Sequence, residues 1–126
     1  MEESLFHVRT GAYIFNDNNE VLLLQNHDNT WGIPGGHLNN KETIEKGLSR
    51  EVMEETGINI AIIRLLRLFS KGKDVIVLYY ARTSENKVTV SDEHNDYSWV
   101  SIEEISGYNL KYAEIIDDIK TILSDL

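Results

Sequence analysis

The stretch GHLNNKETIEKGLSREVMEETGI, residues 36–58, decides most of what this sequence says about fold and function. Its middle part predicts a helix that begins near Thr43 and ends near Thr56. Thr43 or Asn40 can cap the first turn, and Gly57 supplies the left-handed residue at which many helices end. The last two turns of this helix carry most of its acidic side chains, so they are the first place to look for chemistry.

Three glutamates share one side of the expected helix. Glu51, Glu54 and Glu55 stand at positions i, i+3 and i+4, and at about 100° per residue they fall within a sector of about 100°. Ile44 and Leu48 lie in or beside the same sector one and two turns earlier. The acidic patch therefore continues the apolar stripe of the helix, whereas a solvated acidic face would oppose it.

These glutamates are unfavourable for an isolated helix. Like charges at such spacings repel, and the last turn already holds the negative end of the helix dipole; each effect costs from a few tenths to about 1 kcal/mol. A divalent cation would reverse both effects, because Mg²⁺ and Mn²⁺ prefer oxygen-rich carboxylate clusters. Arg50 can pair with Glu54 at i, i+4 and orient it. The alternative is a surface helix that is merely acidic.

The same stretch resembles the Nudix box. Two positions depart from the usual pattern: Asn39 and Lys41 replace an acidic residue and a glycine that many members carry. WGIPGG at residues 31–36 and EHNDYSWVSIEEI at residues 93–105 are similar to further segments of the family, so the resemblance covers most of the chain. Within the box, all defining positions match: Gly36, Glu42, Arg50, Glu51, Val52, Glu54, Glu55, Gly57 and Ile58.

The resemblance implies an α/β fold in one domain over residues 1–126: a Nudix-type α/β/α sandwich with a mixed β-sheet, in which the box forms a loop-helix-loop. It implies Mg²⁺-dependent hydrolysis, with Mn²⁺ as a possible substitute, of a pyrophosphate bond in a small nucleoside diphosphate-linked substrate such as a nucleoside triphosphate or nucleotide sugar. A nucleoside monophosphate is the implied product. The implied metal ligands are the Gly36 carbonyl, Glu51, Glu54 and Glu55, with Arg50 orienting the carboxylates and Glu42 tying the loop to the helix.

A pyrophosphate bond is shielded by negative oxygens, so attack by water needs charge neutralisation and positioning more than covalent catalysis. A carboxylate can accept the proton of the water. Glu51 and Glu54 are the leading candidates for this base, and Glu93 is a rival. Glu93 lies in SDEHND, a segment with three acids and no Lys or Arg, for which a solvated acidic loop is the alternative.

Candidates for substrate binding are fewer. Arg9, on an expected strand, can meet a substrate phosphate. Trp31 and Tyr80 are candidates for stacking on a base, although packing is the commoner role of such aromatics. The four histidines are scattered without the spacing of a zinc site, which favours surface or loop roles. Lys71 and Lys73 can also meet phosphates, with solvated surface charge as the alternative.

Apolar patterns outside the box predict the rest of the fold. Residues 6–15 and 20–25 read as a hairpin around the turn NDNN, and residues 60–69, 74–81 and 96–100 as further strands. Apolar residues recur every three or four positions from Leu110 to Leu126, which predicts an amphipathic helix used for packing. The segment HDNTWGIPGG, residues 27–36, is expected to be an ordered loop without regular structure.

Composition narrows the function classes. The formal net charge of −9 argues against a general nucleic-acid binder, and a polyanionic substrate would need a bound cation. The apolar runs are too short to span a bilayer, the N-terminus does not read as a signal peptide, and there are no cysteines, so the expected location is the cytoplasm. The expected partner is a small nucleotide-like molecule, with a monomer or homodimer both open. The rival function is a non-catalytic Nudix-like sensor of a nucleotide or nucleotide sugar.

Overall fold

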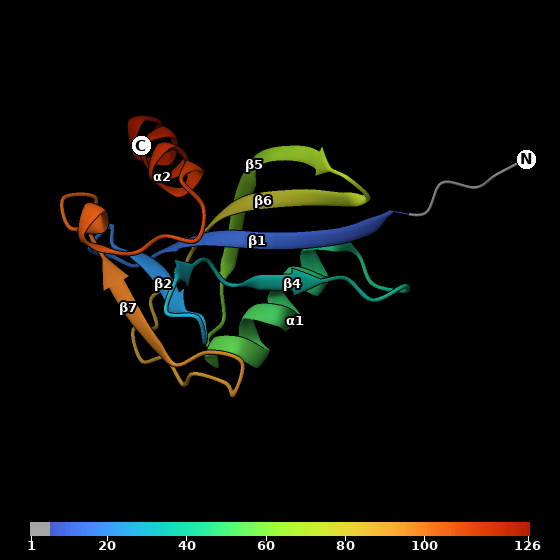
Figure 1. The fold of residues 1–126 in the computed structure, drawn as a ribbon, viewed down its shortest axis with the longest axis horizontal. Helices are drawn as coiled ribbons and strands as arrows, with labels where there is room; N and C mark the ends of the chain where they lie inside the picture. The colour runs from blue at the N-terminus through green and yellow to red at the C-terminus, as the bar shows by residue number, and fades with distance from the viewer. Residues whose placement is uncertain (1–5) are drawn as a thin grey trace, which may run out of the picture.

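The computed structural model describes residues 6–126, in which seven strands form one mixed sheet with a helix on either face (Figure 1). The sheet order is β3-β2-β1-β6-β5, while β4 pairs with β1 and β7 pairs with β2. The elements are β1 (His7–Phe15), β2 (Val21–Gln25), β3 (Trp31–Gly32), β4 (Gly35–His37), α1 (Ile44–Thr56), β5 (Ala61–Lys71), β6 (Asp74–Arg82), β7 (Asp96–Val100), a short 3₁₀ turn η1 (Ile105–Gly107) and α2 (Glu114–Ser124).

Strand β1 organises the sheet. It runs parallel to β6 along its whole length, from the pair His7 and Asp74 to the pair Phe15 and Arg82. On its other side it meets β2 only near Phe15, because the two strands of this hairpin diverge. Strand β4 fills the opening and pairs antiparallel with the first half of β1. This arrangement brings the glycines of β4 next to the centre of the sheet.

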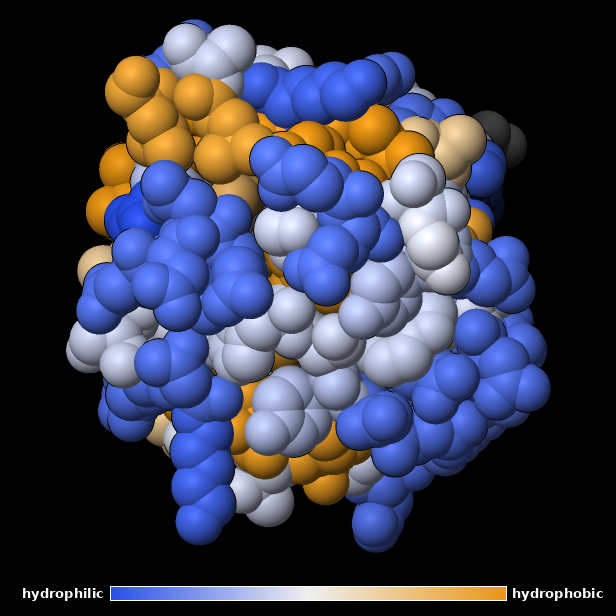
Figure 2. Space-filling model, turned by 90° about the vertical axis from the view of Figure 1, so that its left-hand side faces the viewer, coloured by the Kyte–Doolittle hydropathy of each residue, from blue (hydrophilic) through white to orange (hydrophobic). Residues whose placement is uncertain are grey.

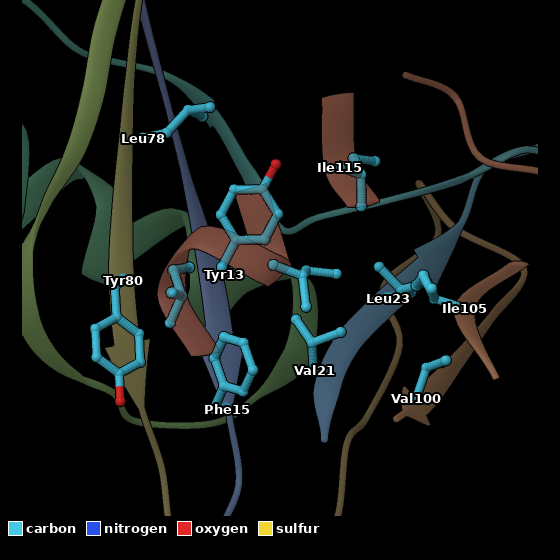
Figure 3. Close-up of a cluster of buried hydrophobic side chains, with 11 residues drawn as sticks. Tyr13, Phe15, Val21, Leu23, Leu78, Tyr80, Val100, Ile105 and Ile115 are labelled. Carbon is cyan, nitrogen blue, oxygen red and sulfur yellow. The ribbon is translucent and has the colours of Figure 1, made fainter. Parts of the chain in front are cut away.

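Side chains of β1 point alternately to the two faces of the sheet, and the core accordingly has two layers. Tyr13 and Phe15 pack under α2, whose Ile115 and Ile119 belong to the same buried cluster (Figure 3). The intervening residues, including Ile14, pack on the other face against Leu48 and Val52 of α1. Because the second half of β1 is covered on both faces, its sequence from Ala12 to Phe15 is a continuous apolar run. The two layers confirm the α/β/α sandwich expected from the sequence.

Most of the expected elements are present. The hairpin, the strands around residues 60–82 and 96–100, and the helix that ends at Gly57 are confirmed. The expectation for residues 27–36 is partly wrong, because this segment contains β3 and the beginning of β4. Their hydrogen bonds go to β2 and β1, and the segment itself, rich in turn-forming residues, gives no sign of such partners.

The C-terminal helix begins later than its periodicity indicates. Residues Leu110–Ala113 are not part of α2, which starts at Glu114. Leu110 instead forms an isolated bridge with Trp31, so pairing with β3 holds the backbone extended at this point.

Hydrophilic residues cover most of the face shown in Figure 2; hydrophobic residues gather in its upper part, at the height of α2 in Figure 1, and a smaller group shows in its lower middle. Among residues 6–126, no helix combines the length and apolar character needed to cross a membrane.

Candidate active site

The ends and the buried stripe of α1 fix the direction of its side chains. The Thr43 hydroxyl accepts a hydrogen bond from the Lys46 amide at 3.3 Å, and Gly57 closes the helix in the left-handed conformation with φ of 71°. Leu48 and Val52 are fully buried under the sheet. Since Glu55 continues this stripe, the helix carries a carboxylate into the protein at the end nearest β4.

Glu55 is the most buried of the box carboxylates. It is 3% exposed, and the backbone amide of Gly35 donates to its two oxygens at 3.3 and 3.4 Å. Burial raises the pKa of Glu55 to about 8, and the charges of Glu51 and Glu93 add to the shift, although the Gly35 amide opposes it. The protein therefore holds a carboxyl group in a place where its charge lacks sufficient compensation.

Glu51 lies against Gly36 of β4. A methyl group added at Gly36 would come within 2.5 Å of the Glu51 carboxylate, so any larger residue here would displace that carboxylate from its position against β4. The Glu51 side chain is 16% exposed, and burial raises its pKa even though Arg50 donates to it at 3.2 Å.

Arg50 is the centre of a network of carboxylates. It donates to both oxygens of Glu42 at 2.9 and 2.7 Å, and it reaches Glu54 at 3.1 Å. Glu42 also accepts the Asn39 amide at 2.8 Å, so it joins the loop before the helix to the helix itself. The hydrogen bonds from Arg50, reinforced by that amide, lower the pKa of Glu42 to about 2. The expected Arg50–Glu54 pair and the tying role of Glu42 are confirmed.

A cavity of about 400 Å³ opens beside these residues. Glu51, Glu55 and Glu93 line it together with Gly36, so the loop glutamate and the box glutamates share one site although they are about forty residues apart in sequence. Glu54 is absent from this lining, and its side chain is 59% exposed.

Cationic side chains also line this cavity. Arg9 comes from β1, as the sequence analysis expected. The sequence analysis did not name Lys111 as a site residue, because nothing in its local sequence indicates such a role. Two backbone hydrogen bonds fix its segment to β3: Trp31 donates to Asn109 at 2.8 Å, and Lys111 donates to Trp31 at 2.9 Å. Carboxylates and cations thus meet in one cavity, which suits a phosphate chain accompanied by a metal ion.

His94 is a second lining residue that sequence reasoning did not single out as part of the site. Its Nδ1 atom is buried and has no hydrogen-bond partner within residues 6–126. Burial lowers the pKa of His94, with the negative charge of Glu93 opposing the shift.

The two aromatic candidates lie outside this lining. Trp31 packs edge-on against Tyr108 with ring centroids 5.1 Å apart, and its backbone carries the contacts to the Lys111 segment. Tyr80 is 4% exposed and packs edge-on against Phe15 at 5.6 Å. The core cluster in Figure 3 contains Tyr80, so packing accounts for this residue and stacking on a substrate does not fit its position.

The chemistry of the donor set fits a hard divalent cation. Glu51, Glu54, Glu55 and the Gly36 carbonyl offer oxygen atoms alone, which Mg²⁺ and Mn²⁺ prefer. In the described part of the chain, no three acidic or histidine side chains stand in an arrangement that could hold a metal ion. Arg50 bonds both Glu51 and Glu54, so a cation would have to compete with this guanidinium for them.

Comparisons with known proteins agree with this geometry. A family model of the NUDIX domain matches residues 5–120. The chain is 31% identical over 105 residues to a MutT-like protein of Streptomyces ambofaciens, covering 81% of this chain and 68% of that protein. It is 29% identical over 98 residues to the nucleoside triphosphatase NudI of Klebsiella pneumoniae (strain 342), with coverages of 66% and 70%. The crystal structure of a MutT protein from Methanosarcina mazei Go1 is similar with a TM-score of 0.77 and 29% identity, covering 99% of this chain and 98% of that one.

Proposed function

Since the chain belongs to the Nudix family and is one of its pyrophosphohydrolases, we propose that it hydrolyses a nucleoside triphosphate with Mg²⁺, or with Mn²⁺ in its place. Water adds to the phosphorus next to the nucleoside, the bond to the bridging oxygen breaks, and the products are a nucleoside monophosphate and pyrophosphate. The similarity to a protein named nucleoside triphosphatase supports this choice over a nucleotide sugar, which is the second candidate substrate.

The observation that carries the proposal is the mixed charge of the first cavity. Glu51, Glu55 and Glu93 line it together with Arg9 and Lys111. A binding site for a neutral ligand would gain nothing from three clustered carboxylates. Burial raises the pKa of Glu51 and Glu55, and the negative charge of Glu93 adds to both shifts. A phosphate chain bound through a cation uses both signs of charge.

In this proposal Glu51, Glu54, Glu55 and the Gly36 carbonyl hold the metal. When bound, the cation neutralises phosphate oxygens, acidifies the attacking water and stabilises the leaving group. Arg9 and Lys111 bind the outer phosphates and set their position relative to the carboxylates. Arg50 orients the box carboxylates through the bonds described above.

We assign the general base to Glu93, with Glu51 and Glu54, the candidates from the box helix, as the alternatives. Glu93 is exposed, and its carboxylate forms no hydrogen bond to any residue of the described chain, so it is available to take a proton from water. Glu51 is held by Arg50 and sits against Gly36.

A panel assay tests the function. The protein is incubated with nucleoside triphosphates, nucleotide sugars, dinucleotides and simple phosphomonoesters, each with Mg²⁺, with Mn²⁺ and with a chelator, and products are separated by chromatography. We expect cation-dependent release of a nucleoside monophosphate and pyrophosphate from a triphosphate. Hydrolysis of phosphomonoesters alone would overturn the reaction class. Tight binding of a nucleotide without turnover under any of these conditions would favour the sensor.

A further inference from the structure

A second cavity, of about 880 Å³, lies between the sheet and the start of α2. It shares Arg9, Gly35 and Gly36 with the first cavity, so the two adjoin at β4. A substrate whose phosphates occupy the first cavity can therefore extend its organic part into the second without leaving the protein. The volume lies within the usual range for sites that enclose a small organic ligand.

The walls of the second cavity suit a flat aromatic group. Ile33, Ile76, Leu78 and Ile115 contribute apolar surface, and Phe69 contributes an aromatic ring. Figure 3 shows the Tyr13 hydroxyl at the end of the core cluster where Leu78 and Ile115 lie, and all three residues line this cavity. Polar and charged side chains line the remaining surface of the cavity, and they decide which polar groups of a ligand can bind there.

Arg67 is the best positioned of these polar groups. Its guanidinium lies over the Phe69 ring, 4.5 Å from the centroid, and its Nε and one Nη donate to the two oxygens of Asp118, each at 2.9 Å. The Tyr13 hydroxyl donates to the same carboxylate at 2.5 Å. Within residues 6–126 the second Nη of Arg67 has no hydrogen-bond acceptor, and the side chain is 36% exposed.

Arg67 and Asp118 together offer a ligand a hydrogen-bond donor and little accepting capacity. Asp118 is buried and its oxygens already accept three hydrogen bonds, so it offers little to an amino group of a ligand. Arg67 can only donate. Of the other charged lining residues, Arg9 is shared with the first cavity, Lys71 and Asp74 are backbone partners at the end of the β5–β6 hairpin, and Glu114 is exposed at the start of α2.

We propose that the second cavity receives the heterocyclic base of the substrate and that Arg67, held by Asp118 and Phe69, selects bases that turn a carbonyl oxygen towards it. The proposal rests on the proposed function, since it takes the phosphates to lie in the first cavity. A base with an amino group at the same position would place a donor against a donor and leave both without a partner.

Two pairs of nucleotides isolate this effect. Inosine and adenosine triphosphates differ by a carbonyl against an amino group on the same ring system, and uridine and cytidine triphosphates differ in the same way. For the wild-type protein we expect kcat/KM to favour the carbonyl member of at least one pair by about tenfold or more, because each good hydrogen bond to a charged donor is worth about that factor. Equal rates within both pairs would overturn the proposal.

Variants show whether Arg67 is the cause. In Arg67→Met the ratio of kcat/KM within each pair should fall to about twofold or less. In Arg67→Lys, which keeps a charge beside Asp118 but loses the planar fork, this ratio should be lower than in the wild-type protein. Arg64→Met is the matched control. Arg64 lies on the same strand and bonds Asp125 of the same C-terminal region at 2.8 Å, but it lines neither cavity. A purely structural role for Arg67 would lower both members of a pair equally and leave their ratio unchanged, which would also overturn the proposal.

Binding without turnover separates this proposal from the proposed function. Affinities of the same four nucleotides are measured by calorimetry with chelator present, on variants that unfold cooperatively on heating. An Arg67-dependent preference in binding without hydrolysis would support the base site while overturning the reaction. Hydrolysis with no preference in binding or turnover would retain the reaction and overturn the base site.

Discussion

Two arginine-centred networks lie on opposite faces of the sheet and differ in charge balance. The box network, Arg50 with Glu42, Glu51 and Glu54, sets one positive charge against three negative charges and has a formal charge of −2. The sheet–helix network, Arg67 with Asp118 and the Tyr13 hydroxyl, is formally neutral. Folding alone favours a balanced network, because unpaired charge near a protein surface repels its neighbours. The excess in the box network therefore indicates a function that brings its own cation.

The two networks also differ in how far apart their members are in sequence. Arg50 bonds residues one, four and eight positions away, so a single helix and the loop before it assemble the network. Arg67 and Asp118 are 51 positions apart, and Tyr13 and Asp118 are 105 positions apart. The first network forms with the local structure, and the second joins β1, β5 and α2 only when the domain is packed.

The largest expected effect tests the excess charge of the box. Glu55→Gln should lower turnover by at least about 100-fold and weaken divalent-metal binding, while the metal-free protein stays folded or gains stability because a desolvated carboxylate is removed. Glu54→Gln should show the same loss of turnover. Steady-state kinetics, metal calorimetry and thermal unfolding on the same preparations give the three readouts, with Glu45→Gln on the same helix as control. Wild-type turnover in both variants would contradict the metal assignment.

In the sheet–helix network, by contrast, the substitution is expected to lower stability. Asp118→Asn should lower the free energy of unfolding by about 2 kcal/mol, because Arg67 loses a charged partner and Tyr13 loses a strong acceptor. Urea unfolding measures the change. Asp125→Asn is the control, because Asp125, whose side chain is 59% exposed, forms with Arg64 a surface pair worth at most about 1 kcal/mol. Equal losses of unfolding free energy in the two variants would show that the buried network stabilises the fold no more than the surface pair does.

A smaller effect on turnover is expected from Glu93, which lines the box site without belonging to the box network. Glu93→Gln should reduce turnover about tenfold to 100-fold while leaving metal affinity of the substrate-free protein unchanged. The comparison with Glu55→Gln, in which metal affinity falls as well, separates a base from a ligand. If turnover of Glu93→Gln equals that of the wild type, catalysis belongs to the box helix.

The smallest expected effect concerns acid stability of the box network. Arg50 lowers the pKa of Glu42 to about 2 from its ordinary 4.5. A folded-state pKa below the unfolded value contributes stability that is present above about pH 4.5 and is lost as the pH falls towards about 2. Glu42→Gln should therefore be less stable than wild type at pH 6, with the difference shrinking by pH 3. Urea unfolding at both pH values, with Glu103→Gln for comparison, measures this, and a constant difference would exclude the ionic contribution.

The sequence predicted the box helix and its network because both depend on short-range geometry. Helical periodicity alone places Glu51, Glu54 and Glu55 on one side, and Thr43 and Gly57 mark the ends. Burial of Glu55 followed from its position on the apolar stripe. Local sequence could not separate the exposed Glu54 from the buried Glu55, because their difference arises from the sheet packed over α1.

The remaining parts depend on contacts between distant segments. Strands β3 and β4 exist because β1 and β2 diverge and leave backbone groups to pair with, which no local pattern in residues 27–36 reveals. Backbone hydrogen bonds to Trp31 bring Lys111 to the cavity, and Tyr80 belongs to the core because β6 lies inside the sheet, between β1 and β5.

By itself the sequence determined the family, the capped helix and the placing of the box glutamates on one side of it, because these are fixed by residue identity and by spacings of a few positions. The tertiary structure alone decided that Glu93 and Lys111 join the box residues, and that Arg67 faces a second cavity beside them. The physical reason is that a side chain's partners and its exposure to water are set by the packing of segments that are distant along the chain.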